Sequence, residues 1–468
     1  MRDTFTPASE RRQAVGGNNL WFDPLLAGVA TTLLALGLVM VASASISLSD
    51  RQFGQPFYYT LRQLIFVALG LLAAWGVTRT RLVYWEKGGV VLLFAGIALL
   101  VAVLIPGLGR QVNGSSRWLP FGLFNLQASE PVKLFVIVYI AGYLVRHSDA
   151  VRTTFQGFLK PLALLSFIAV LLLLEPDFGA TAVIFATALG MLFLGGVRLW
   201  QFAAVLGVVG AIAATLTLTS PYRMQRLTTF LDPWADPFDS GFQLTQALIA
   251  IGRGEWFGVG LGGSIQKLFY LPEAHTDFLF AVLAEELGLL GVVVVVALFM
   301  LLVWRAFVIG YRAEISGNRF GAYLAYGLGM WLAMQAFINI GVNMGALPTK
   351  GLTLPLMSYG GSSIIVMCMA VALLLRVDYE TRFPRGRSAV QSAKGLVGET
   401  PSPQPSPARG RGGVGKEWLE APSPQPSRAS GRGGDSSYFF SAGEGMSKRE
   451  PSPYPLPKGE GTRKGWFT

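Results

Sequence analysis

The sequence has few of the side chains that build cross-links and metal centres. Its 468 residues include one cysteine, Cys368, and two histidines, His147 and His275. One cysteine cannot form an intramolecular disulfide, so cysteine usage gives no information on the compartment. Two histidines also exclude a His-rich metal site.

Charged residues are scarce as well. They make up 14% of the chain, against about 25% in a typical soluble domain. The deficit lies in apolar runs of about 18 to 25 residues, each long enough to cross the roughly 30 Å hydrocarbon layer as a helix. We therefore predict an all-α integral membrane protein with about ten transmembrane helices, near 24–46, 58–78, 88–106, 128–146, 158–175, 177–195, 199–219, 277–304, 321–345 and 353–376.

The formal net charge of +11 would suggest nucleic-acid binding in a soluble protein. Here much of the basic excess falls in loops and in the C-terminal tail, where membrane topology explains it. The distribution favours cytoplasmic N- and C-termini. Three segments then lie outside: 107–127, a large extracytoplasmic loop of about 220–276 between helices 7 and 8, and the turn at 345–352.

The domain organisation follows from these patterns. Residues 1–23 form a cytoplasmic N-terminal segment, 24–384 form the membrane domain, and 385–468 form a cytoplasmic tail rich in Pro, Gly and Arg. The tail repeats a Pro-Ser-Pro-Gln-Pro-Ser motif, a composition that cannot bury a core and predicts disorder. It is either a docking tail or a translated repetitive element.

The long outer loop mixes cations such as Arg223 and Arg253 with aromatic residues such as Trp234 and Trp256. This mixture suits a ligand with a sugar, an anionic group and a lipid tail, and it equally suits anchoring at the lipid headgroups. The loop also contains a G-x-G-x-x-G pattern at 258–263. We reject a dinucleotide site because the pattern requires a preceding strand and a following helix.

Asp277 closes this loop and opens the eighth span. An Asp at this position is most often a helix N-cap, but an ionisable group at the edge of a bilayer is also a functional candidate. The helix N-terminus favours its carboxylate, whereas burial disfavours it. The sequence alone leaves that competition open.

Two further charged features stand near the outer boundary. Glu130 and Lys133 are three residues apart, on one helix face, which favours a structural or functional ion pair inside the bundle. Lys350 lies in the outer turn, where it would hold a phosphate or meet lipid headgroups.

Taken together, the motifs resemble those of the SEDS family of cell-wall proteins, which contains FtsW, RodA and SpoVE. The matching segments run in order through residues 24–380; they are Gly114–Trp118, Gln127–Lys133, Glu175–Thr181, Leu271–Asp277 and Leu356–Ser363. Pro348–Pro355, which contains Lys350, resembles the cell-division branch of the family. Two positions depart from the family pattern: Ala128 replaces a usual proline, and Glu175 stands where glutamine is commoner.

The resemblance implies a peptidoglycan glycosyltransferase that polymerises lipid II and releases undecaprenyl pyrophosphate during septal wall synthesis. It implies Asp277 as the catalytic residue, and we add a set of candidate substrate-binding residues: Lys350, Arg223, Arg253, Arg117 and His275. We assign no cofactor and no metal ligands, and a divalent cation (Mg2+ or Mn2+) is left open.

The resemblance also implies partners and a location. The partners are a glycan strand on undecaprenyl pyrophosphate, a class B penicillin-binding protein with transpeptidase activity (FtsI-like), other divisome proteins and membrane lipids, with no nucleic acid. The location is the bacterial inner membrane at the division septum. Two alternatives remain: a lipid II flippase, whose path would be lined by Glu130, Lys133, Asn339 and Asn343, and a non-catalytic scaffold for the transpeptidase.

Overall fold

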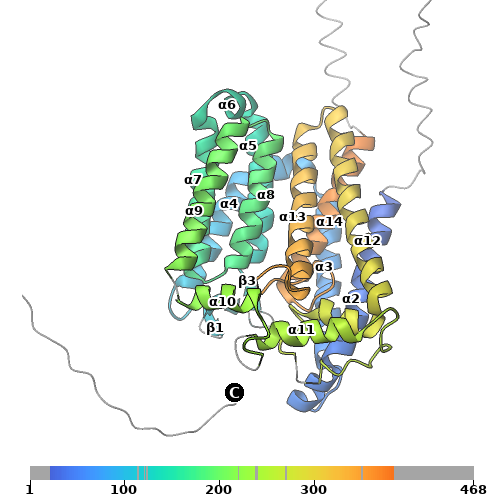
Figure 1. Ribbon diagram of the computed structural model, residues 1–468. Helices are drawn as coiled ribbons and strands as arrows, with labels where there is room; N and C mark the ends of the chain where they lie inside the picture. The colour runs from blue at the N-terminus through green and yellow to red at the C-terminus, as the bar shows by residue number, and fades with distance from the viewer. Residues whose placement is uncertain are drawn as a thin grey trace, which may run out of the picture. The chain divides into compact units, whose positions relative to one another are not determined.

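The computed structural model describes residues 22–112, 115–120, 122, 125–219, 221–237, 241–268, 271–348 and 351–383. These residues form a bundle of long helices with a small sheet at one end (Figure 1). The helices are α2 Pro24–Phe53, α3 Tyr58–Arg79, α4 Leu82–Leu104, α5 Ser129–Arg146, α6 Ser148–Thr153, α7 Phe155–Leu174, α8 Phe178–Leu194, α9 Leu199–Leu218, α10 Pro221–Leu231, α11 Phe242–Arg253, α12 Leu279–Ile315, α13 Arg319–Asn343 and α14 Gly361–Arg382.

Each predicted span falls on one of these helices. Seven of the described helices are long and apolar enough to cross a membrane, namely α2, α3, α4, α7, α12, α13 and α14, and α8 and the first part of α9 are apolar but shorter. The prediction of a helical multi-pass membrane protein is confirmed. The count of about ten spans and the domain limits remain predictions, and the tail lies outside the described residues.

The local sequence explains where the first helix begins. Pro24 occupies the first turn of α2, where a missing N–H costs nothing. The side chain of Asp23 accepts a hydrogen bond from the Leu26 N–H at 2.9 Å, which caps the helix. Asp23 is buried and also binds Arg305 of α12 and Arg382 of α14. The start of α2 is thereby tied to two helices far away in the sequence.

The packing divides into two neighbouring groups. On one side α4 packs against α5, and α5 packs against α8; on the other side α3 packs against α14, and α12 packs against α2 and α13. Helix α13 contacts both α5 and α8 and joins the groups. The most buried large side chains include Trp331 of α13 and Lys133 of α5.

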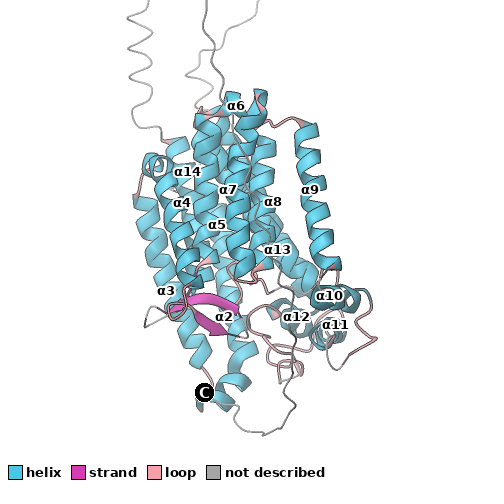
Figure 2. Cartoon of the chain, turned by 90° about the vertical axis from the view of Figure 1, so that its left-hand side faces the viewer, coloured by secondary structure: helices cyan, strands magenta, loops and turns pink. Residues whose placement is uncertain are grey.

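The sheet and the two short helices α10 and α11 lie at the same end of the bundle, opposite α6 (Figures 1 and 2). We call this end the site end. The sheet contains β1 Arg110–Val112, β2 Ser115–Pro120 and β3 Asn125–Gln127, antiparallel in the order β1-β2-β3. The long segment predicted at 220–276 begins and ends at the site end, and α10 and α11 fall within it.

Helix α12 is broken at Gly288, whose φ of 65° and ψ of −168° are accessible almost only to glycine. The break frees backbone groups that then pair with the loop after α11. Val259 N–H donates to Glu285 O at 3.0 Å, and Leu289 N–H donates to Glu255 O at 2.9 Å. A Cβ on Gly288 would lie 2.3 Å from the Gly258 nitrogen, so the two backbones require glycine to meet.

Candidate functional site

Asp277 lies in the loop that leads into α12, and its backbone is held from α13. Asn339 Nδ2 and Asn343 Nδ2 both donate to the Asp277 carbonyl oxygen, at 2.9 and 3.0 Å. Asn343 Oδ1 accepts from the Ala281 N–H at 3.1 Å and so caps the first turn of α12. The N-cap position itself is Phe278, which makes no side-chain cap. The interpretation of Asp277 as an N-cap is therefore wrong.

The environment of Asp277 favours the protonated acid. Burial raises the pKa of its carboxyl group to about 7, and the negative charge of Glu273 adds to the rise. Arg117 opposes the rise, and Asp177 adds a smaller contribution to it. The pKa of Asp277 therefore moves in the direction that burial favours, which the sequence alone left open. A carboxyl group with a pKa near neutrality is well suited to act as a general base.

The segment before α14 lies directly against this carboxyl group. A Cβ built on Gly351 would lie 3.0 Å from Asp277 Oδ2. The next residue is fixed by Asn339, whose Nδ2 donates to the Leu352 carbonyl at 2.5 Å. Lys350 precedes Gly351 in the chain but lies outside the described residues. Arg223 belongs to α10, and its side chain is likewise outside the description.

Arg117 lies on β2 and reaches the end of α7. Its Nε donates to the Glu175 carbonyl at 3.1 Å, and its Nη2 donates to the Pro176 carbonyl at 2.5 Å. Asp177 caps α8 through the Ala180 N–H at 3.1 Å. The sheet therefore brings a cation to the same region as Asp277, with Asp177 beside it. The predicted candidates Arg117 and Asp277 are neighbours although they are 160 residues apart.

His275 is buried in an aromatic cluster formed by separate parts of the chain. Its ring centroid lies 4.8 Å from that of Tyr59 on α3 and 5.4 Å from that of Tyr359 before α14. Burial lowers the pKa of His275, while the charge of Glu273 opposes this effect. A neutral imidazole can donate or accept a hydrogen bond but adds no positive charge to the site.

Arg62 on α3 was not identified from the sequence. Its Nη1 donates to the Tyr58 hydroxyl at 3.2 Å, and its guanidinium lies 5.6 Å from the centre of the Tyr58 ring. Arg62 forms no ion pair within the described part of the chain, and its charge acts on Tyr59 and Tyr359. Arg62 belongs to no motif that the sequence displays, which is why the sequence pattern did not single it out.

The positive charge of Arg253, by contrast, is already compensated by an ion pair. Its Nη1 lies 2.7 Å from Glu285 Oε1, and Glu285 also accepts from Ser264 Oγ and from the Ile265 N–H. The neighbouring Glu286 pairs with Lys267 at 2.7 Å. Both glutamates are fully buried just before the break in α12. The two ion pairs hold the loop after α11 to α12, which leaves Arg253 less suited to bind an anionic substrate.

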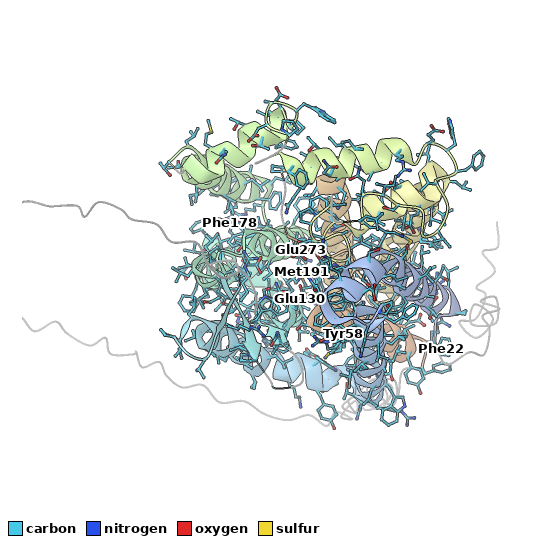
Figure 3. The ribbon with its side chains drawn as sticks, turned by 90° about the horizontal axis from the view of Figure 1, so that it is seen from below. Phe22, Tyr58, Glu130, Phe178, Met191 and Glu273 are labelled. Atoms are coloured by element: carbon cyan, nitrogen blue, oxygen red, sulfur yellow. The ribbon has the colours of Figure 1, made fainter. Side chains whose placement is uncertain are left out.

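The predicted partners Glu130 and Lys133 lie in contact inside the bundle. Lys133 Nζ is 2.9 Å from Glu130 Oε1 and also donates to Gln335 Oε1 at 2.9 Å. Gln335 Oε1 also accepts from Trp331 Nε1, and Gln335 Nε2 donates to the Thr353 carbonyl at 3.1 Å. The network therefore connects the interior of α5 to the segment that lies against Asp277. Figure 3, viewed from the site end, labels Glu130 and Glu273.

The described residues contain no group of three or more His, Cys, Asp or Glu side chains that could hold a metal ion. The candidate site combines the Asp277 carboxyl group, the charge of Arg117 acting on it, and a cluster of aromatic rings around His275 on which the charge of Arg62 acts. It lies at one end of a polytopic helical membrane protein, where the helices meet an interfacial sheet and two short helices.

Comparison with known proteins identifies this class. The model of the FtsW, RodA and SpoVE family, described as "Cell cycle protein", matches residues 24–383, and the chain belongs to this family. The chain is 63% identical over 374 residues to the probable peptidoglycan glycosyltransferase FtsW of Nitrosococcus halophilus, covering 80% of this chain and 96% of that protein. It is 55% identical over 360 residues to the protein of the same description from Coxiella burnetii, covering 77% of this chain and 97% of that protein.

Solved structures share the fold. A chain from a study of how a peptidoglycan synthase complex coordinates polymerization and crosslinking aligns with a TM-score of 0.63 at 28% identity, covering 77% of this chain and 98% of that one. The rod shape determining protein RodA of Thermus thermophilus aligns with a TM-score of 0.58 at 27% identity, covering 78% of this chain and 99% of that one.

Proposed function

We propose that the chain is a peptidoglycan glycosyltransferase that polymerises lipid II in septal cell-wall synthesis. The observation that carries the proposal is Asp277: two asparagines hold its backbone carbonyl, and burial raises the pKa of its carboxyl group to about 7. The relatives described as probable FtsW glycosyltransferases, at 55 to 64% identity, support the reaction class.

The reaction joins two lipid-linked sugars. The 4-hydroxyl oxygen of the acceptor sugar attacks the anomeric carbon of the donor, and the bond from that carbon to the pyrophosphate breaks on the opposite face. An α-linkage becomes a β-1,4 linkage, and undecaprenyl pyrophosphate leaves with the bonding electrons. Asp277 takes the hydroxyl proton, a role typically worth about 10²–10⁴-fold in rate.

Negative charge develops on the departing pyrophosphate, so cations near Asp277 stabilise the transition state. Arg117 acts electrostatically on Asp277, and Arg62 offers a guanidinium without an ion-pair partner among the described residues. Lys350 and Arg223 remain candidates, and Mg2+ or Mn2+ assistance is left open. His275 would act as a neutral hydrogen-bonding group in this scheme.

The flippase alternative finds little support in the contacts. The four residues that would line a path through the bundle are at most 4% exposed, and each is hydrogen-bonded within the protein: Glu130, Lys133, Asn339 and Asn343. The break in α12, a feature common in transporters, is filled by the loop after α11.

The partner and the location belong to the same proposal. A transpeptidase of the class B penicillin-binding protein type would receive the glycan strand, in agreement with the peptidoglycan synthase complex of which one chain shares the fold. We place the site end on the outer side of the bacterial inner membrane at the septum, with both termini in the cytoplasm.

The test is reconstitution of the purified chain in vesicles with lipid II, with and without its cognate transpeptidase. The proposal expects glycan polymer on the site-end side. Movement of lipid II between leaflets without polymer would support the flippase, and neither activity, with or without the partner, would support a scaffold.

A further inference from the structure

Glu175, at the end of α7, is a buried acid that the proposed mechanism does not use. Its side chain is 1% exposed. Neither carboxyl oxygen meets a hydrogen-bond donor among the residues that the structure describes. A buried carboxylate without a partner is costly, and such a group usually takes up a proton instead. Its position beside the site makes its protonation state relevant to catalysis.

Two charged neighbours face this group, and their hydrogen bonds differ from those of Glu175. Arg117 from β2 directs Nε and Nη2 to the backbone carbonyls of residues 175 and 176, not to the Glu175 carboxyl group. Asp177 accepts hydrogen bonds from the Ala180 N–H and from Ser129 Oγ, at 3.1 and 2.9 Å. Asp177 thus has the donors that stabilise a carboxylate, and Glu175 has none.

The electrostatics agree with this division. Burial, together with the negative charge of Asp177, raises the pKa of Glu175 to about 8, against the opposing effect of Arg117. The same Asp177 and Arg117 act on the carboxyl group of Asp277. A charge on Glu175 would therefore add a second negative charge beside Arg117 in a region that already holds Asp177.

We infer that Glu175 carries a proton at neutral pH and acts as a positioning residue for Arg117. While Glu175 is protonated, Arg117 stays hydrogen-bonded to the backbone carbonyls of residues 175 and 176, beside Asp277. Alkaline conditions remove that proton. Once ionised, the Glu175 carboxylate competes for the donors of Arg117 and draws the guanidinium away from the carbonyls of residues 175 and 176. Arg117 then no longer holds this corner of the site, and polymerisation slows. The inference rests on the proposed function, because its effect on rate acts through Asp277.

The experiment compares polymerisation of lipid II by the wild type and by Glu175→Gln between pH 6 and pH 9. Glutamine has the size of the protonated acid and cannot ionise. The ratio of the wild-type rate to the variant rate should fall about tenfold between pH 7 and pH 9, because the protonated fraction of a group with a pKa near 8 falls by that factor. A constant ratio, or a variant inactive at pH 7, would overturn the inference. Glu255→Gln, an exposed acid at the same end, is the matched control and should keep the wild-type profile.

A stability measurement tests the same proton without relying on activity. The raised pKa means that the folded state binds the proton more tightly than the unfolded chain, so stability from this group is lost as pH rises from about 4.5 to about 8. The unfolding temperature of Glu175→Gln minus that of the wild type should therefore be larger at pH 8.5 than at pH 5. An equal difference at both pH values contradicts the inference. If the wild type makes no polymer at any pH, the proposed function fails, while the unfolding temperatures still decide whether Glu175 is protonated.

Discussion

Replacing Lys133 with methionine should be among the most damaging single changes in the interior. Lys133 is 1% exposed, donates to both Glu130 and Gln335, and lies 5.5 Å from the centre of the Trp331 ring. Glu130 Oε2 has no donor among the described residues, so the variant leaves a buried carboxylate with no partner at all. Breaking a buried ion pair from one side costs about 3–5 kcal/mol.

The assay is a double-mutant cycle on the free energy of unfolding in mixed micelles. Lys133→Met alone should lose about 3–5 kcal/mol, whereas adding Glu130→Gln should recover most of the loss, because the uncompensated charge is removed. Lys87→Met, at an exposed position on α4, is the control and should change stability by less than about 0.5 kcal/mol. Additive losses in the double variant would refute the account of this network.

Three further outcomes are expected. The initial rate of polymerisation should rise about fivefold from pH 6 to pH 7, because Asp277 with a pKa of about 7 accepts a proton only when ionised; a flat profile would contradict this. Gly351→Ala places a Cβ 3.0 Å from Asp277 Oδ2 and should lower the rate at least about tenfold while the protein still folds, since small displacements of catalytic groups are costly; an unchanged rate would argue against contact. Gly288→Ala should lower the free energy of unfolding by about 2–4 kcal/mol through strain and overlap with the loop, whereas Gly28→Ala, in open space, should not.

The helices could be predicted because the membrane imposes a simple rule. An apolar run of sufficient length must satisfy its backbone internally, so runs such as 24–46 and 321–345 correspond to α2 and α13. The small sheet could not be predicted, since β1 and β3 have three residues each and depend on pairing with β2. From the sequence, the glycines at 258–263 matched only the dinucleotide motif that we rejected. Their packing against the break in α12 could not be predicted, because it depends on residues distant in the sequence.

The candidate site could be located from the sequence as a hypothesis, whereas the contacts of its residues could not. The candidate aspartate stands where a polar loop meets an apolar run, which the sequence displays directly. Its pKa depends on burial and on Glu273, Asp177 and Arg117, which come together only in three dimensions. The two arginines Arg253 and Arg62 also could not be distinguished from the sequence. Arg253 forms an ion pair with Glu285, whereas Arg62 forms no ion pair with a described residue, and no local sequence pattern reveals this difference.

The central claim is that the Asp277 carboxyl group takes the proton during sugar transfer. The most direct measurement is polymerisation of lipid II by purified Asp277→Asn, in the presence of its transpeptidase partner, against the wild type. Asparagine preserves the size of the side chain and the backbone held by Asn339 and Asn343, so the variant should fold, reach the membrane and bind its partner. We expect no glycan polymer from it; polymer at a near-normal rate would contradict the mechanism.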